Sequence, residues 1–230
     1  AMTITTNDSS GTDADVTIDG GTTALVIAAS TIDGDLTLTS GNASGITDSG
    51  TVTVGGNFSA TTDANNGVIN VGTMAVDGTV ALNTNGNGAA TIVNDAGLNF
   101  AASTVGGALS ATATTANITD TGALAITGTT TLVTSADDAT IALDVATNAF
   151  TGAMTITTND SSGTDADVTI DGGTTALVIA ASTIDGDLTL TSGNASGITD
   201  SGTVTVGGNF SATTDANNGV INVGTMAVDG

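Results

Sequence analysis

The amino-acid sequence lacks nine of the twenty residue types: Lys, Arg, His, Glu, Gln, Pro, Cys, Trp and Tyr are all absent from its 230 residues. Most side chains that enzymes use as acids, bases and nucleophiles are therefore missing, so we expect that the chain is not an enzyme. The absence of cysteine excludes a disulfide framework. The longest apolar run covers residues 24–29, whereas a transmembrane helix needs about 20 apolar residues, so we expect no membrane insertion.

Positive side-chain charge is absent as well, because the 23 ionisable side chains are all Asp and the net charge is -23 at pH 7. A protein without cationic side chains has no basic patch for phosphate backbones or anionic lipids, which excludes nucleic acid and such membranes as partners. Trypsin-like proteases, which cut after Lys and Arg, find no site in this sequence. This composition suits a secreted protein, and we expect an extracellular or cell-surface location.

What the sequence does contain is a verbatim repeat. Residues 1–78 and 153–230 are identical at every position, so the period is 152 residues. We take residues 1–152 as one full repeat unit and residues 153–230 as the start of the next, identical unit. Exact duplication favours an array of equivalent stacked units over a single catalytic pocket. We therefore expect this segment to belong to a longer fibre.

A shorter pattern recurs inside the unit: an apolar residue, a small or polar residue, Gly, any residue, and then alternating residues. It occurs as IDGDLTL, VGGNFSA, VDGTVAL, VGGALSA, ITGTTTL and FTGAMTI, beginning at residues 32, 54, 76, 105, 126 and 150. Its glycines are unevenly spaced, and the two widest gaps follow Gly78 and Gly152. We interpret the pattern as coils of about 25 residues, a length typical of solenoid repeats, with loops of variable length. Each unit then contains two half-units of about three coils.

The alternation of apolar and polar residues predicts the secondary structure of each coil. In residues 36–39 two leucines alternate with two threonines, and residues 51–54 repeat the rule with valine. A period of two indicates strands with one buried face, and clusters of Gly, Asn, Asp and Ser between them indicate frequent corners. Short strands in regular coils predict an all-β, right-handed parallel β-solenoid, or β-helix. An antiparallel sandwich would also show short strands, but it does not need a regular Gly-containing anchor.

Two phrases make the chain similar to a known family. DSGTVTVGG at residues 48–56 and NAFTGAMTI at residues 148–156 resemble the tandem repeats of filamentous-haemagglutinin-like exoproteins, which are large bacterial surface adhesins. The resemblance covers the whole chain. It implies a right-handed β-helical shaft on a cell surface, exported by two-partner secretion.

The candidate metal site consists of Asp13, Asp15 and the equivalent Asp165 and Asp167 of the second copy. Oxygen ligands at alternate positions are typical of calcium loops. Two such residues on one strand lie about 7 Å apart, so the pair could bind Ca²⁺ together with a neighbouring coil. The alternative is a pair of solvated carboxylates at a corner. We expect that no cofactor is required and that Ca²⁺ is the candidate ion.

Charge density gives a second reason to expect an effect of Ca²⁺. One unit contains 14 Asp, and six coils of about 4.8 Å rise about 29 Å, which places one negative charge about every 2 Å of axis. Duplex DNA carries one charge per about 1.7 Å and condenses counterions. We therefore expect divalent cations, Ca²⁺ above all, to stabilise the protein.

Three other functions are less well supported. Paired carboxylates could hydrolyse glycosides, but aromatic side chains for sugar stacking are almost absent. Thr-x-Thr pairs could order water in ice binding, but they do not recur at the same anchor in each coil. Asn-x-Ser/Thr sequences, as at Asn42 and Asn117, have the form of glycosylation acceptors, which chance explains in a chain of this composition.

We therefore expect a structural protein, namely an extracellular filament or adhesin shaft made of tandem β-solenoid repeats, with a role in adhesion or in forming a matrix such as a biofilm. Its expected partners are further copies of its own repeat, in the same chain or stacked end to end, and also neighbouring filaments or cell surfaces. The alternative is a Ca²⁺-dependent adhesive module that binds a glycan or a partner cell surface.

Overall fold

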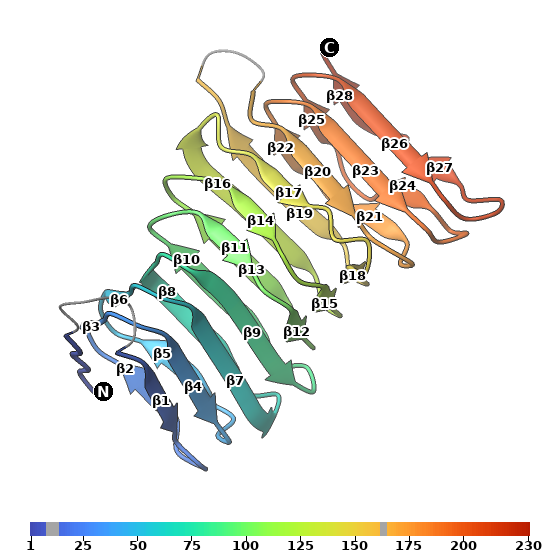
Figure 1. Cartoon of the computed structure of the whole chain (residues 1–230). Coiled ribbons are helices and arrows are strands. Elements are labelled where there is room, and N and C mark those ends of the chain that lie inside the picture. Colours follow the sequence, from blue (N-terminus) through green and yellow to red (C-terminus); the bar gives the residue numbers. More distant parts are fainter. Residues whose placement is uncertain (8–13, 162–164) are drawn as a thin grey trace.

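The computed structural model describes residues 1–7, 14–161 and 165–230, and within these residues every regular element is a β-strand. No helix in the described part of the chain is long and apolar enough to cross a membrane. The strands wind into about ten coils that stack along one axis from the N-terminus to the C-terminus (Figure 1). Paired strands run parallel. The prediction of an all-β parallel solenoid is confirmed.

One side of the solenoid is a sheet of 13 strands among the described residues. Its main path follows every coil, and its strands are β1 (Val16–Asp19), β4 (Leu36–Ser40), β7 (Phe58–Asn65), β9 (Thr79–Asn85), β11 (Leu98–Phe100), β14 (Ile118–Asp120), β17 (Ile141–Leu143), β20 (Val168–Asp171), β23 (Leu188–Ser192) and β26 (Phe210–Thr214). Beside this path lie β12 (Ser103–Val105), β15 (Leu124–Ile126) and β18 (Ala149–Phe150).

The opposite side is a sheet of 15 strands, again counted over the described residues. Its main path contains β2 (Leu25–Ile27), β5 (Ile46–Asp48), β8 (Ile69–Val76), β10 (Ala90–Asn94), β13 (Leu109–Ala113), β16 (Thr130–Asp137), β19 (Met154–Asn159), β21 (Leu177–Ile179), β24 (Ile198–Asp200) and β27 (Ile221–Asn222). Beside this path lie β3 (Ser30–Ile32), β6 (Val52–Val54), β22 (Ser182–Ile184), β25 (Val204–Val206) and β28 (Met226–Val228).

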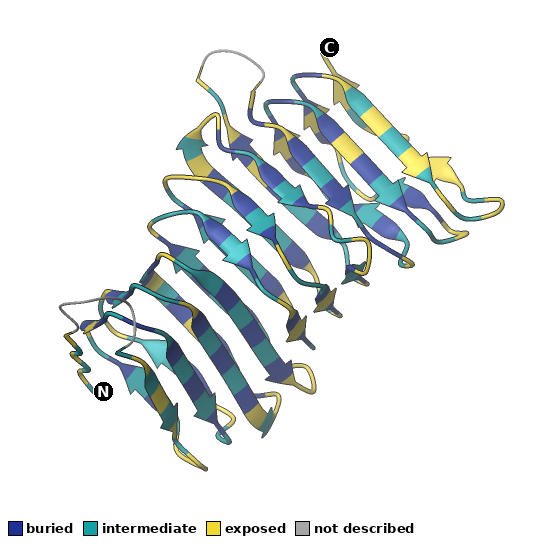
Figure 2. Ribbon diagram, viewed as in Figure 1, coloured by how far each residue is buried: buried dark blue, intermediate teal, exposed yellow. Residues whose placement is uncertain are grey.

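The core lies between the two sheets and is built by the alternation seen in the sequence. In β4, buried and half-buried residues alternate strictly, and the same pattern recurs in β10 and β13 (Figure 2). The strand register stacks the inward residues Leu36, Phe58 and Val80 in one column. Beside it, Ala60 lies between two leucines of the neighbouring coils, so small and large side chains fill the interior together.

The anchor glycines stack on one another from coil to coil. The amide of Gly56 donates to the carbonyl of Gly34 at 3.0 Å, and the amide of Gly128 donates to the carbonyl of Gly107 at 3.0 Å. A Cβ added at Gly128 would lie 2.4 Å from the carbonyl carbon of Gly107. The glycine of the recurring pattern is therefore required by the close approach of two backbones.

An ordinary coil has a single strand in one sheet and a pair of short strands in the other. At first the 13-stranded sheet holds the single strands β4 and β7, while β2 with β3 and β5 with β6 form pairs in the opposite sheet. In the middle of the chain the arrangement is reversed, since β13 and β16 are single strands of the 15-stranded sheet and β14 with β15 form a pair opposite them. From β20 onward the first arrangement returns.

We call the two places where the arrangement reverses sheet exchanges. At the first exchange (residues 79–105) the single strands β9 and β10 follow each other directly, and the pair β11 and β12 then lies on β9. At the second exchange (residues 154–184) the single strands are β19 and β20, and the pair β21 and β22 lies on β19. Each half-unit is therefore rotated by roughly half a turn about the axis relative to the previous one.

At each exchange a pair of short strands lies on a single strand, and a buried serine makes hydrogen bonds where the chain bends between the two short strands. Ser103 accepts a hydrogen bond from the amide of Leu82 at 3.1 Å and donates to the carbonyl of Ala101 at 2.9 Å. Ser182 has the equivalent bonds at the second exchange, where it accepts from Ile156. The sequence Ala-Ala-Ser-Thr marks this arrangement at residues 101–104 and 180–183. It also occurs at residues 28–31, where Ser30 accepts from the amide of Ile4 and donates to the carbonyl of Ala28, as in the identical segment at the second exchange.

The strand register corrects the predicted coil length and coil number. Seven successive strand pairings lead along the 13-stranded sheet from β4 to β23, which is its copy in the second unit. The 152-residue unit thus has seven coils of about 22 residues, where six of about 25 were expected. At about 4.8 Å per coil, one unit rises about 34 Å.

The two wide gaps after Gly78 and Gly152 are the physical reason for the miscount. They are not stretched loops, because each contains more than one coil and an anchor that the sequence pattern did not reveal. Gly88 lies two residues before β10, and Gly107 donates to its carbonyl at 2.8 Å. Ala166 takes the same place two residues before β20.

Candidate functional site

A column of Asp, Asn and Thr side chains runs along the corner before β4, β7 and β9. Asp15 Oδ1 accepts from the amide of Asp35 at 2.8 Å, and Asp35 Oδ1 accepts from the amide of Asn57 at 2.6 Å. Asn57 Oδ1 in turn accepts from the amide of Thr79 at 2.9 Å. Each side chain therefore binds the backbone of the next coil, and its anchor glycine leaves the space for this contact.

The second copy repeats this column with Asp167. Its Oδ1 accepts from the amide of Asp187 at 2.7 Å. Two of the four predicted metal ligands, Asp15 and Asp167, thus have a structural role in joining coils. Asp13 lies outside the described residues, and Ca²⁺ binding by this set stays a prediction.

The fourth predicted ligand, Asp165, lies beside a group of acidic residues that we call the acidic corner: Asp137, Asp138 and Asp160. Carboxylate oxygens of these three residues lie within 4.8 Å of one another. The amide of Asp165 donates to Asp160 Oδ2 at 3.3 Å. Three carboxylates at such distances are a donor set that hard cations such as Ca²⁺ prefer.

The pKa values of the neighbouring carboxyl groups Asp137 and Asp138 are shifted in opposite directions. The side chain and amide of Ser161 donate to Asp137, which lowers the pKa of that carboxyl below its usual value. Partial desolvation, followed by the charges of Asp137 and Asp160, raises the pKa of Asp138. A bound cation would relieve the repulsion at Asp138.

Sequence reasoning missed the acidic corner because its members come from different coils. Asp137 and Asp160 lie on successive coils, in the segments around β16 and β19 that pair with each other. An acidic residue recurring after one coil length is the signal that would have found them, once the coil length was known.

Two further aspartates show how a corner carboxylate is used elsewhere. The hydroxyl of Thr225, followed by the amides of Gly224 and Thr225, donates to Asp200 and lowers the pKa of Asp200. Burial raises the pKa of Asp120 against the opposing hydrogen bond from Asn148. These carboxylates serve coil-to-coil bonding.

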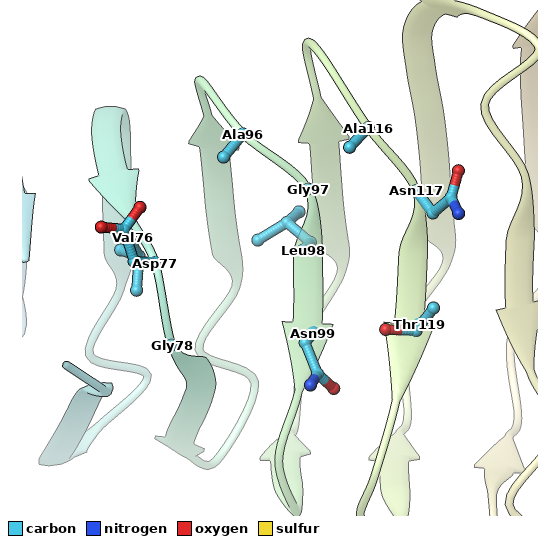
Figure 3. A pocket seen from close by; sticks show the side chains of 10 residues that line it. All are labelled: Val76, Asp77, Gly78, Ala96, Gly97, Leu98, Asn99, Ala116, Asn117 and Thr119. Carbon is cyan, nitrogen blue, oxygen red and sulfur yellow. The ribbon is translucent and has the colours of Figure 1, made fainter. Parts of the chain in front are cut away.

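A cleft of about 270 Å³ lies at the first sheet exchange, and Figure 3 shows the residues that line it. One wall is residues 76–78 and the other is residues 96–99, with residues 116, 117 and 119 of the next coil beyond. β9 and β11 pair from Thr79 and Asn99 onward. Before that point the Asn94 side chain joins the walls, since it donates to the carbonyls of Val76 and Gly97.

The fold and the exact repeat define the class of protein, which is a parallel β-solenoid built from tandem repeats. Within that class the chain belongs to the family described as "Repeats of unknown function (DUF5649)", which matches residues 13–69, 87–157 and 165–228. The starts of successive matches are offset by approximately one half-unit, so the family repeat and the half-unit coincide. No curated protein and no solved structure matches the chain significantly.

Proposed function

We propose that the protein is the shaft of an extracellular filament or surface adhesin, and that its role is structural rather than enzymatic. The observation that carries this proposal is that the 152-residue unit occupies a whole number of coils. A following identical unit therefore continues both sheets in the same orientation. Many such units add length without a change of direction.

Composition supports an extracellular location for this shaft. The sequence offers no site to trypsin-like proteases, because Lys and Arg are absent. With 14 Asp in about 34 Å, one unit carries one negative charge per about 2.4 Å, so shafts repel one another and stay soluble. The resemblance to filamentous-haemagglutinin-like exoproteins agrees with a surface shaft, although the family match itself is to repeats of unknown function.

Electron microscopy of the full-length protein tests the shaft directly. We expect smooth straight rods whose length increases by about 34 Å for each 152-residue unit. Antibodies against the repeat should label intact cells without permeabilisation. Compact particles, or labelling only after permeabilisation, would contradict the proposal.

The acidic corner favours a second candidate, a shaft whose adhesion depends on Ca²⁺. Its three carboxylates would bind the ion once per unit. We expect Ca²⁺ to raise the melting temperature at micromolar to millimolar concentrations, and Asp138→Asn to remove most of this rise. A glycan array with and without chelator then separates the two functions, because only an adhesive module shows saturable, chelator-sensitive binding. An unchanged melting temperature after exhaustive chelation would exclude a stabilising Ca²⁺ site.

A further inference from the structure

The last described coil, which contains β26, β27 and β28, has an apolar face that no described strand covers. Val220, Ile221 and Val228 are the large apolar side chains that the described chain exposes. The same coil of the first copy, residues 58–76, has the identical sequence and is covered by β9 and β10. The uncovered face therefore fits a coil that resembles residues 79–94.

Such a coil is present at the beginning of the chain. Residues 2–6 correspond to residues 80–84 of β9, because the amide of the third residue in each segment, Ile4 or Leu82, donates to a buried serine of the following coil. The threonine hydroxyl of the fifth residue in each segment accepts from an amide of that coil. β1 then corresponds to β10, since the two strands pair in the same way with β4 and β13. The first coil is therefore an equivalent of the coil that covers β7 and β8.

The first coil also has an uncovered face, at the opposite end of the stack from β26 to β28 (Figure 1). Met2, Ile4, Val16 and Ile18 are half-buried there. Their copies in β19 and β20 are fully buried against the preceding strands β16 and β17. Both end faces are apolar, so a contact between them removes hydrophobic surface from water.

We propose that copies of the chain join end to end, with the first coil of one copy on the last coil of another and a rotation of roughly half a turn about the axis. We call this contact the axial joint. Residues 2–6 lie on β26 as β9 lies on β7, and β1 lies on β27 as β10 lies on β8. The register of those pairings places Ile4 on Ala212 and Val16 on Ile221.

The second sheet exchange supplies a hydrogen bond for the corner of the axial joint. There the amide of Phe150, at the end of a strand pair, donates to the hydroxyl of Thr175 at 3.1 Å. Val228 has the corresponding place in β28, and Thr23 is the copy of Thr175 in the first coil. The amide of Val228 therefore donates to Thr23 of the joining copy.

The two faces in the axial joint are different surfaces, so the contact is heterologous and continues from copy to copy into a filament. Each copy has a net charge of -23 and contains no cationic side chain, so no side-chain ion pair forms and repulsion opposes joining. The axial joint goes beyond the structural role proposed above and does not depend on an extracellular location.

Sedimentation velocity of the 230-residue chain tests the proposal. We expect the mass to increase with protein concentration, and more strongly in about 0.5 M than in about 0.05 M salt, because salt screens the repulsion. Electron microscopy should show rods that lengthen by about 48 Å for each copy of about ten coils. Monomers under all conditions, or joining that weakens as salt increases, would overturn the proposal.

Matched charge substitutions identify the surfaces in contact. Ile221→Asp places an unpaired carboxylate inside the axial joint, whereas Asn222→Asp adds the same charge to the outer side of the same strand. We expect Ile221→Asp to weaken joining about a hundredfold or more and Asn222→Asp to change it by less than about threefold. Ile4→Asp and Thr3→Asp form the same pair at the other end. Equal effects within either pair would contradict the axial joint.

A mixture of the two joint variants distinguishes the axial joint from a symmetric contact. Each variant keeps one intact face, so we expect Ile221→Asp and Ile4→Asp to be monomeric alone and to form dimers, and nothing longer, when mixed. If two last coils paired with each other, Ile4→Asp alone would form dimers, which would overturn the proposal. Circular dichroism confirms that each variant is folded.

Hydrogen exchange of the unsubstituted chain gives a test that needs no variant. The amide of Ile69 already donates to the carbonyl of Ala89 of the covering coil at 3.0 Å. Its copy Ile221 gains the equivalent bond only in the axial joint. We expect protection of the Ile221 amide to rise with protein concentration while that of Ile69 stays constant. An Ile221 amide that exchanges equally fast at every concentration would refute the axial joint and leave the proposed shaft untouched.

Discussion

Residues 68–76 and 220–228 have the same sequence and different surroundings. Ile69 is 1% exposed, whereas its copy Ile221 is 45% exposed. Val76 is 2% exposed, whereas Val228 is 40% exposed. The first segment is covered by β10, and no described strand covers the second (Figure 2). The burial of a residue in this fold is therefore a property of the next coil as much as of its own sequence, and stability is expected to be a sum of contacts between neighbouring coils.

The largest effect is expected for Asn94, whose side chain bonds to the backbone of Val76 in place of a neighbouring strand. Asn94 Oδ1 accepts from the amide of Val76 at 2.8 Å, and its Nδ2 donates to the carbonyls of Val76 and Gly97. Asn94→Ala leaves three backbone groups unpaired, so we expect a loss of about 3 kcal/mol or more in urea unfolding. The exposed Asn70 is the control, and Asn70→Ala should stay within about 0.5 kcal/mol. Equal losses for the two variants would show that the backbone around the cleft does not depend on Asn94.

A pair of identical substitutions in the two copies tests the comparison itself. We expect Ile69→Ala to cost about 2–4 kcal/mol and Ile221→Ala less than about 1 kcal/mol, because only Ile69 leaves a closed cavity. Hydrogen exchange of the adjacent strands measures each effect locally, which avoids the assumption of a single unfolding transition. Similar losses at both positions would contradict the view that the covering coil decides burial.

The anchor glycines provide a smaller test. A Cβ at Gly56 would lie 2.2 Å from Asp35 Oδ1, whereas a Cβ at Gly72 has no neighbour within 4 Å. We expect Gly56→Ala to lower stability by about 1–3 kcal/mol and Gly72→Ala to change it by less than about 1 kcal/mol, in the stabilising direction. Thermal unfolding followed by circular dichroism is sufficient to compare them. A Gly56→Ala protein as stable as the parent would remove the reason given for the glycine column.

The smallest effect is expected from charge at the acidic corner, measured in the presence of chelator. The folded-state pKa of Asp138 is raised, so its charged form is unfavourable and the penalty is relieved as pH falls through that pKa. The folded-state pKa of Asp137 is lowered, so its contribution is present above the unfolded pKa and is lost as pH falls through the folded value. At pH 7 we therefore expect Asp138→Asn to raise the melting temperature and Asp137→Asn to lower it.

Both differences should disappear once the pH is below the usual carboxyl range. Asn tolerates the left-handed backbone of residue 138, where φ is 59°. The dependence on pH, rather than the absolute shift, therefore isolates the charge. Curves for Asp137→Asn and Asp138→Asn that stay parallel from pH 7 to pH 3 would contradict the assignment.

The sequence was sufficient to predict strands, corners and stacking, because alternation such as that in β4 is a local property. It was not sufficient for the sheet exchanges. Ala166 hides one anchor by replacing glycine, and Gly88 hides another by following Gly78 after much less than one coil. The acidic corner and the cleft were missed for a related reason, since Asp137 meets Asp160, and residues 76–78 and 96–99 line one cleft, only when the register of neighbouring coils is known.

The sheet exchanges have a mechanical consequence for a long array. The two sides of a coil differ, because one is a single strand and the other a bent pair of strands. A stack of coils in one orientation therefore has two unequal sides, and we expect such a stack to curve. Rotation by roughly half a turn after each half-unit places the shorter edge alternately on opposite sides of the solenoid. Whatever bend one half-unit introduces, the next reverses. We therefore expect an array of such units to be straight.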